Sequence, residues 1–137
     1  MSTDLTQMIR DRMVPFAKTL GIEPVEVTPD KVVATVKVRE DLSTSPTTMH
    51  GGAIMAIADT LGAVGTVVNI PRGARTTTLE SKTNFFRAIP VGESLTAESI
   101  PLHKGRSTHV WQTRLMREDG KLAAIVTQTQ MVLMPDK

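Results

Sequence analysis

The pattern of apolar and polar positions divides the chain into a helical start, a short region of alternation, one long apolar run and four further alternating segments. The apolar run covers residues 51–71 and contains one ionisable side chain, Asp59. Because glycines recur and Asp59 lies near its centre, the run predicts a buried core helix over residues 50–70 and no membrane span. A buried carboxylate is costly unless it is hydrogen-bonded or paired. Asp59 is therefore either satisfied by the fold or held there for chemistry.

The first residues carry apolar positions at helical spacing, which predicts a helix over residues 3–20 that covers the core. Ser2 or Thr3 is the expected N-cap. Pro15 should kink or restart this helix, and Gly21 is its expected stop. The apolar stripe consists of Leu5, Met8, Ile9, Met13, Phe16 and Leu20.

After this helix the period changes to two. Residues 31–38 predict a half-buried strand, and residues before it predict a partner strand that turns at Pro29-Asp30. The hydroxyl-rich residues 41–49 are expected to form a loop that leads into His50. The inward face of the strand should carry Val32, Ala34, Val36 and Val38.

Four alternating segments follow the long helix, and each is expected to be a strand: residues 76–87, 93–102, 107–118 and 121–134. Their connectors contain hairpin-type turn residues, at 89–92, 104–106 and 118–120. Four consecutive strands joined by tight turns predict a continuous antiparallel sheet.

One long helix that is apolar nearly all round must be covered on most of its circumference. We therefore expect an α+β fold in which a curved antiparallel sheet of five or six strands wraps the helix. Ala58, Gly62 and Gly65 form a small-residue face that would let the helix approach the sheet closely. Val110 and Met131 would remain on the other side of the sheet, which predicts self-association.

Length and composition are those of one globular domain spanning residues 1–137, with an N-terminal helical segment at 1–21. The net charge of +2 comes from scattered residues, so no nucleic-acid partner is expected. The chain has no cysteine, which excludes disulfides and thiol catalysis, and its histidines lack ligand-like spacing, so we expect no metal. A cytoplasmic location is the default expectation.

Four segments together resemble the hotdog-fold acyl-CoA thioesterases of the phenylacetic-acid-degradation type, in the 4-hydroxybenzoyl-CoA thioesterase superfamily. They are HGGAIMAIADTLGA (50–63), FFRAIPVGESLTAE (85–98), KGRS (104–107) and EDGKLAA (118–124). The resemblance extends over residues 30–134. It implies a hotdog fold, hydrolysis of an acyl-CoA without a cofactor, and a homodimer with a shared sheet that often pairs into a homotetramer.

The resemblance also implies roles for the residues at the start of the helix. Asp59 matches the acid that acts as general base or nucleophile, and the N–H of Gly51 matches the donor that polarises the thioester carbonyl. His50 would hydrogen-bond near the thioester, and Gly52 would lie beside it. Alternatively, Asp59 is bonded to structural groups, the two glycines only permit a tight turn, and His50 is structural.

The loop before the helix departs from the family pattern. The family has an asparagine and a glycine where this chain has Thr44 and Thr47. Thr44 retains a hydroxyl but lacks the second polar atom of an amide, and Ser43 or Ser45 could substitute for it. Thr78 matches a serine or threonine that lies near the acid in the family.

Four residues match positions near the phosphates of coenzyme A in relatives or are further candidates for this role: Arg87, Lys104, Arg106 and Ser107. The alternative is that they are solvated turn residues.

Two other functions compete with thioester hydrolysis. A non-catalytic acyl-CoA sensor of this fold usually lacks the helix acid and carries a DNA-binding segment. A hotdog hydratase or dehydratase would carry its own histidine–acid arrangement, which this sequence does not show. We therefore expect an enzyme, an acyl-CoA thioesterase.

Overall fold

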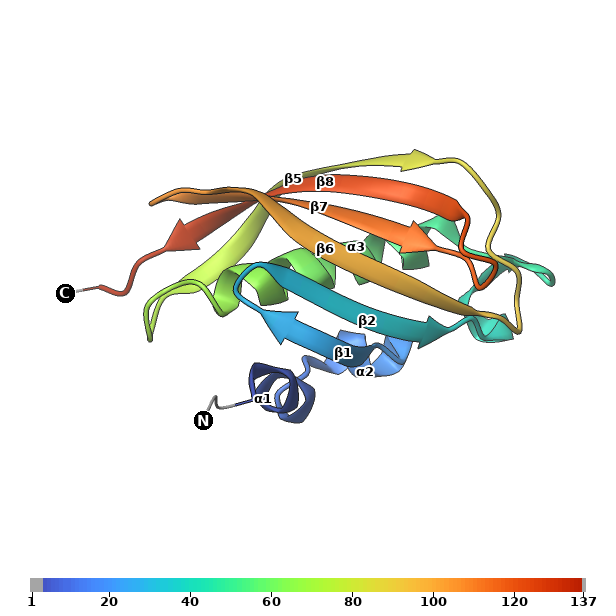
Figure 1. Cartoon of the computed structure of the whole chain (residues 1–137), viewed down its shortest axis with the longest axis horizontal. Coiled ribbons are helices and arrows are strands. Elements are labelled where there is room, and N and C mark those ends of the chain that lie inside the picture. The colour runs from blue at the N-terminus through green and yellow to red at the C-terminus, as the bar shows by residue number, and fades with distance from the viewer. Residues whose placement is uncertain (1–3, 137) are drawn as a thin grey trace.

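A six-stranded antiparallel sheet curves around one long helix, α3 (Gly51–Val67), in the computed structural model, which describes residues 4–136 (Figure 1). The expected α+β class and the hotdog arrangement are confirmed. In order across the sheet, the strands are β1 (Glu23–Thr28), β2 (Lys31–Lys37), β6 (Ser94–Lys104), β7 (Thr108–Met116), β8 (Leu122–Leu133) and β5 (Arg75–Phe85).

Helix α3 lies against the sheet through its small residues. The side chain of Gln128 occupies the space where a Cβ on Gly62 would lie, and a Cβ on Gly65 would be 2.5 Å from Cη2 of Trp111. The indole Nε1 of Trp111 donates to Oγ1 of Thr66 at 3.0 Å, so the ring is fixed within the core. The small-residue face expected from the sequence is therefore confirmed, and it admits two large side chains from the sheet.

The alternation expected for residues 31–38 is also confirmed. Val32, Ala34, Val36 and Val38 are buried. Strand β2 pairs with β1 through the turn at Pro29-Asp30 and with β6 on its other side. The inward face of β2 thus packs beneath the helix as part of one core.

The expected order of the last four strands is wrong in one respect. Strand β5 does not pair with β6; it pairs with β8 and forms an edge of the sheet. The connector between β5 and β6, residues 86–93, includes the 89–92 segment that was expected to be a hairpin turn, but it crosses from the β5 edge to the interior strand β6. The crossing passes the start of α3, where the N–H of Met49 donates to O of Ile89 and the N–H of Val91 donates to O of Thr47.

Two further expectations need correction. Residues 41–49 are not a plain loop, because they contain part of a 3-10 turn (Glu40–Leu42) and a small hairpin of β3 (Ser43–Ser45) with β4 (Thr48–Met49). The helix expected over residues 3–20 is two helices, α1 (Leu5–Asp11) and α2 (Pro15–Leu20), with the restart at Pro15 and the stop at Gly21 as expected.

Their boundaries follow from local chemistry. Pro15 restarts the chain as the first residue of α2, and Gly21 ends α2 with a left-handed φ of 76°. Asp4 caps α1 by accepting from the N–H of Thr6. Ser2 and Thr3, the expected caps, lie outside the described residues.

The two edges of the sheet differ. Helix α1 covers the β1 edge, where Oγ1 of Thr6 accepts from the N–H of Val27 at 2.9 Å and Arg10 donates to O of Pro24 at 2.7 Å. The β5 edge has no strand beyond it within the described residues, and Leu79 and Phe85 on this strand are 54% and 52% exposed. An uncovered strand with exposed apolar side chains is a template for pairing with another chain.

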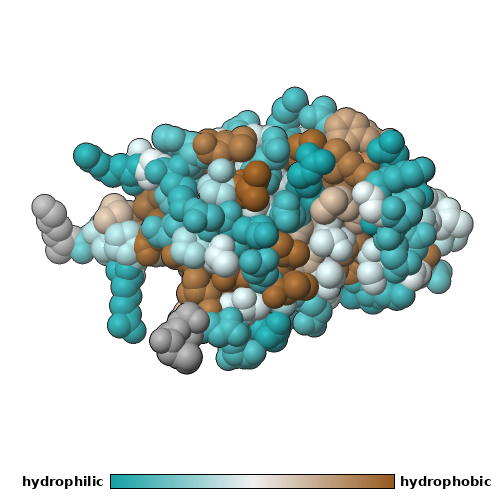
Figure 2. All heavy atoms as spheres, viewed as in Figure 1, coloured by the Kyte–Doolittle hydropathy of each residue, from teal (hydrophilic) through white to brown (hydrophobic). Residues whose placement is uncertain are grey.

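Apolar groups also reach the surface elsewhere. Figure 2, drawn from the same side as Figure 1, shows them in patches between polar side chains. No helix among residues 4–136 is long and apolar enough to cross a membrane.

Candidate active site

The carboxylate of Asp59 is half-buried and is held from the sheet. The hydroxyl of Thr78, on β5, donates to Oδ1 of Asp59 at 2.6 Å. Within residues 4–136 no cation pairs with Asp59. One strong hydrogen bond therefore fixes this carboxylate while leaving its charge uncompensated.

A network of buried amides stands behind Thr78. Nε2 of Gln130 donates to Oγ1 of Thr78 at 2.6 Å and to Oε1 of Gln128 at 2.5 Å, and Thr76 donates to Oε1 of Gln130 at 2.8 Å. Because Thr78 accepts from Gln130, its single hydroxyl proton is directed to Asp59. Thr78 is thus oriented as a donor to the carboxylate.

The roles of Gln128 and Gln130 at the site were not predicted from the sequence. Gln128 and Gln130 are fully buried, and Nε2 of Gln128 donates to the helix carbonyl of Ala58 at 2.7 Å. The alternation of β8 contained the signal, since it places both amides on the same face as Val126 and Val132. Two amides on an inward strand face require buried partners, and here those partners are the helix and Thr78.

His50 caps the start of α3. Its Nδ1 accepts from the N–H of Gly52 at 2.7 Å, so a neutral ring carries its proton on Nε2. The N–H of the preceding residue, Gly51, has no acceptor among residues 4–136. An unpaired N–H at a helix N-terminus attracts negative charge. Within the described residues the N–H of Gly51 is therefore unpaired, while that of Gly52 is used by the cap.

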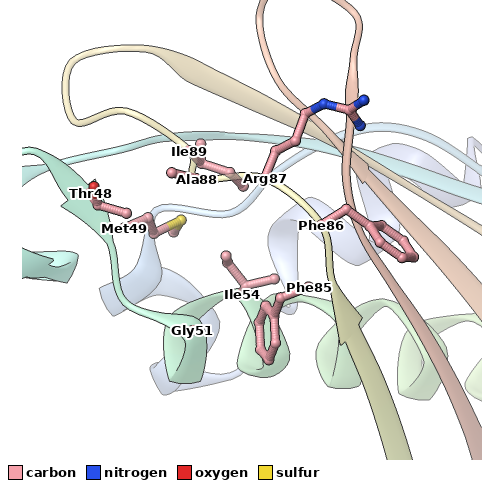
Figure 3. A pocket seen from close by; sticks show the side chains of 9 residues that line it. All are labelled: Thr48, Met49, Gly51, Ile54, Phe85, Phe86, Arg87, Ala88 and Ile89. Atoms are coloured by element: carbon pink, nitrogen blue, oxygen red, sulfur yellow. The ribbon is translucent and has the colours of Figure 1, made fainter.

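Gly51 lies in a pocket of about 390 Å³ formed where the crossing segment meets the helix start. The ring of Phe85 lies beside Gly51 and Ile54, whereas the guanidinium of Arg87 points away from them (Figure 3). A Cβ on Gly51 would be 3.2 Å from Cζ of Phe85. Nη1 of Arg87 donates to O of Leu122 at 2.7 Å. The pocket is thus apolar beside Gly51, with a cation at its rim.

Asp59 and Gly51 are not brought together within one chain. They are eight positions apart on α3, which separates them by about 12 Å along the helix axis. Asp59 lines a different hollow, beside α1. One chain therefore presents the carboxylate of Asp59 and the N–H of Gly51 at two separate places.

Thr44 and its neighbours lie in the small hairpin before α3. Thr44 and Ser45 are exposed, and Oγ of Ser43 donates to O of Glu40 at 2.5 Å. Oγ of Ser45 lies 3.4 Å from the hydroxyl of Thr47. These hydroxyls stand near His50 in sequence, and none of them contacts Asp59.

The other predicted coenzyme A residues lie at the far end of α3. Nζ of Lys104 donates to Oδ1 of Asp30 at 2.7 Å and to Oδ1 of Asn69 at 3.3 Å, beyond the C-terminal end of the helix. Arg106 and Ser107 are exposed in the adjoining turn. The structure thus places Arg87 near Gly51 and separates Lys104 from it; a phosphate role stays a prediction for all four residues.

The remaining histidines are strand residues, as expected. His103 is on β6 and His109 is buried on β7, where burial lowers the pKa of its imidazole. No group of three or more metal-ligating side chains occurs in the described part of the chain.

Comparison with known proteins places this geometry in a family context. The chain is 30% identical over 108 residues to the 1,4-dihydroxy-2-naphthoyl-CoA hydrolase of Listeria monocytogenes, covering 79% of this chain and 87% of that protein. The crystal structure of thioesterase HI1161 from Haemophilus influenzae superposes with a TM-score of 0.85 at 26% identity, covering 97% of this chain and 92% of that one.

A second solved structure supports the fold alone. The PaaI protein of the E. coli phenylacetic acid degradation operon has a TM-score of 0.85 at 22% identity, covering 95% of this chain and 92% of that one. The family model of the Thioesterase superfamily matches residues 47–124, which include the start of α3, Asp59 and strands β5 to β7. This chain belongs to the thioesterase superfamily and is a thioester hydrolase.

Proposed function

We propose that this protein hydrolyses an acyl- or aryl-CoA thioester to the carboxylic acid and free coenzyme A. The observation that carries the proposal is the half-buried carboxylate of Asp59, fixed by Thr78 at 2.6 Å with no cationic partner in the described chain. A carboxylate held without a compensating charge is available to take a proton or to attack a carbonyl. The relative named for a naphthoyl-CoA is the basis for including aryl groups.

The proposed reaction uses water and needs neither metal nor cofactor. Asp59 takes a proton from water, and the resulting hydroxide attacks the thioester carbonyl carbon. The N–H of Gly51 stabilises the negative charge that develops on the carbonyl oxygen. The C–S bond then breaks, and the proton passes to the departing thiolate. If Asp59 instead attacks the carbonyl carbon directly, the C–S bond breaks and the thiolate leaves as coenzyme A, with a mixed anhydride formed between Asp59 and the acyl group. The N–H of Gly51 again stabilises the negative carbonyl oxygen, and water then hydrolyses the anhydride to the carboxylic acid and free Asp59.

This chemistry requires two copies of the chain. The carbonyl carbon and oxygen of a thioester are bonded to each other, whereas Asp59 and Gly51 of one chain are about 12 Å apart along α3. We therefore propose that each active site combines Asp59 of one subunit with Gly51 of a second copy. A homodimer then has two such sites.

Strand β5 offers the surface for this pairing. It is an uncovered edge, and it passes Asp59 at Thr78 and Gly51 at Phe85. Antiparallel pairing of β5 with the same strand of a second copy would be twofold symmetric, so residue i would meet residue j and residue j would meet residue i. The Thr78 part of one strand would then approach the Phe85 part of the other. Pairing of such dimers into a tetramer remains an expectation from the family resemblance.

A mixing experiment tests the shared site. Gly51→Pro removes the N–H at a helix position that tolerates proline, and Asp59→Asn removes the base. Each variant alone should be inactive. Co-refolded at equal amounts, half of the dimers carry one copy of each, and each such dimer has one intact site, so activity should return to about a quarter of wild type.

A site built within one chain gives the opposite result, because no subunit of the mixture would carry both groups. Recovery below about a fiftieth of wild type, with mixed dimers verified by differential tagging, would reject the shared site.

Removal of the Thr78 hydroxyl should impair the reaction without preventing folding. Thr78→Val keeps the shape of the side chain but leaves Oδ1 of Asp59 and Nε2 of Gln130 without this partner. A hydrogen bond to a charged group contributes about 1.5–3 kcal/mol, so kcat should fall about 10- to 100-fold. Thr78→Ser, which retains the donor, is the matched control and should recover most of kcat at an unchanged melting temperature.

The proposed function itself is tested by thiol release from a panel of short, medium, long-chain and aryl-CoA thioesters, with p-nitrophenyl esters as an arm for simple esterases. Turnover of at least one CoA thioester with kcat/KM above about 10⁴ M⁻¹s⁻¹ is expected. Tight binding of acyl-CoA without release of thiol would identify the sensor alternative and reject the proposal.

A further inference from the structure

A second hollow of about 330 Å³ lies between α3 and the N-terminal segment, and Asp59 forms part of its wall. Its N-terminal side carries Met8 and Ile9 of α1 and Met13 of the segment after it, and its α3 side carries Ala63 and Val64. Thr60 also lines it, but the hydroxyl of Thr60 donates back to O of Ala56 at 2.8 Å. Apart from Asp59 and Arg12, the lining therefore offers apolar surface.

The hollow is elongated along the helix. Its α3 wall runs from Asp59 to Val67, which is eight residues or about 12 Å of helix. Two apolar side chains on opposite walls are left open to solvent: Val14 is 56% exposed and Val67 is 47% exposed. An apolar ligand lying between them would remove both from water, which favours its binding.

Resting on the proposed function, we infer that this hollow, the acyl groove, binds the acyl chain of the thioester whose carbonyl lies at Asp59. The occupant follows from what the groove adjoins. A thioester carbonyl within reach of Asp59 carries its acyl group on the carbonyl carbon, and the groove begins at that carboxylate. A carboxylate at one end of a groove that is apolar apart from Arg12 suits a chain whose only polar group is at one end.

The dimensions of the groove set the class of substrate. An engineered apolar cavity of about 150 Å³ holds benzene, so the acyl groove accommodates about twice that volume. A length of about 12 Å accommodates a zigzag chain of about eight to ten carbons, because each C–C bond of about 1.5 Å advances such a chain by about 1.3 Å. The groove thus selects medium-length straight acyl chains, and the flexible side chains of Met8 and Met13 allow it to fit neighbouring lengths.

The test is the dependence of kcat/KM on chain length. For the wild type, burial of each added methylene should raise kcat/KM about fourfold up to about eight to ten carbons, after which the series should level off. Val67→Trp fills the far end of the groove at a half-exposed position that folding tolerates. The ratio of decanoyl-CoA to butyryl-CoA kcat/KM should fall at least tenfold in this variant.

Two further variants complete the design. Val14→Trp fills the groove from the opposite wall and should shift the profile in the same direction, which guards against a local folding defect in one variant. Val25→Trp adds the same bulk at an exposed position on β1 outside the groove and should retain the wild-type profile. A 2-naphthoyl-CoA arm distinguishes a bicyclic ring of similar volume from a straight chain.

The outcomes separate the two proposals. If the wild type hydrolyses neither the straight-chain series nor 2-naphthoyl-CoA, the proposed function fails and the assignment of the groove fails with it. If hydrolysis occurs and both tryptophan variants in the groove keep the wild-type chain-length profile, only the acyl groove is wrong. A preference for 2-naphthoyl-CoA over every straight chain would overturn the assignment to straight chains.

Discussion

Asp59→Asn is expected to lower kcat by about 100- to 10,000-fold while the protein stays folded. Asparagine has nearly the shape of aspartate, and its amide oxygen can still accept from Thr78, which bonds Oδ1 of Asp59 at 2.6 Å. The amide cannot take a proton from water or attack a carbonyl at neutral pH. Thiol release from the best CoA thioester measures kcat, and the melting temperature verifies the fold.

The same substitution at a distant aspartate is the control, because it also removes one negative charge from the protein but leaves the proposed catalytic base in place. Asp11 is exposed at the end of α1, and Asp11→Asn should leave kcat within about twofold of wild type. A loss at Asp59→Asn smaller than about tenfold, or ~1.4 kcal/mol of activation free energy, would show that Asp59 is structural.

Gly65→Ala is expected to lower the free energy of unfolding by about 1–2 kcal/mol, the net of an overpacking cost of about 2–3 kcal/mol and the helix gain given below. The added Cβ would be 2.5 Å from Cη2 of Trp111, a ring with no exposed surface whose Nε1 is bonded to Thr66. The ring or the helix must shift, and this cost exceeds the gain of about 1 kcal/mol that alanine brings to a helix interior. Urea unfolding monitored by circular dichroism measures the difference.

The sequence provides a reporter and a control for this contact. Trp111 is the single tryptophan, so a displaced ring should also shift the fluorescence emission of the folded state. Trp111→Phe removes the outer part of the indole, and in that background the effect of Gly65→Ala should shrink by more than half. An equal cost in both backgrounds would mean that the clash is not with the indole.

The sequence predicted the parts of this structure that depend on local periodicity. Residues 31–38 alternate over a full strand, and the run after His50 is apolar on almost every side, so both elements follow from the pattern alone. The small-residue face of Gly62 and Gly65 was likewise visible from helical spacing. The cytoplasmic location, the absence of a cofactor and the roles of the site residues stay predictions.

The order of the strands could not be read in the same way. The residues at 89–92 have hairpin composition, and only their bonds to Met49 and Thr47 reveal that they cross the start of α3. The partners of Gln128 and Gln130 were also hidden, because both amides bond to groups more than fifty positions away. Long-range pairing depends on tertiary packing, which local composition does not encode.

The attachment of α1 to the β1 edge has an evolutionary consequence. Thr6 and Arg10 bind the outer strand on one side of the sheet, whereas the exposed side chains of Leu79 and Phe85 mark the opposite side. Helix α1, which forms one wall of the acyl groove, is thus attached to the β1 edge of the sheet. The proposed contact between subunits lies along the opposite edge, β5. Substitutions that retune chain-length preference can accumulate in α1 without disturbing assembly. Diversification of specificity and conservation of the oligomer are therefore separable traits in this architecture.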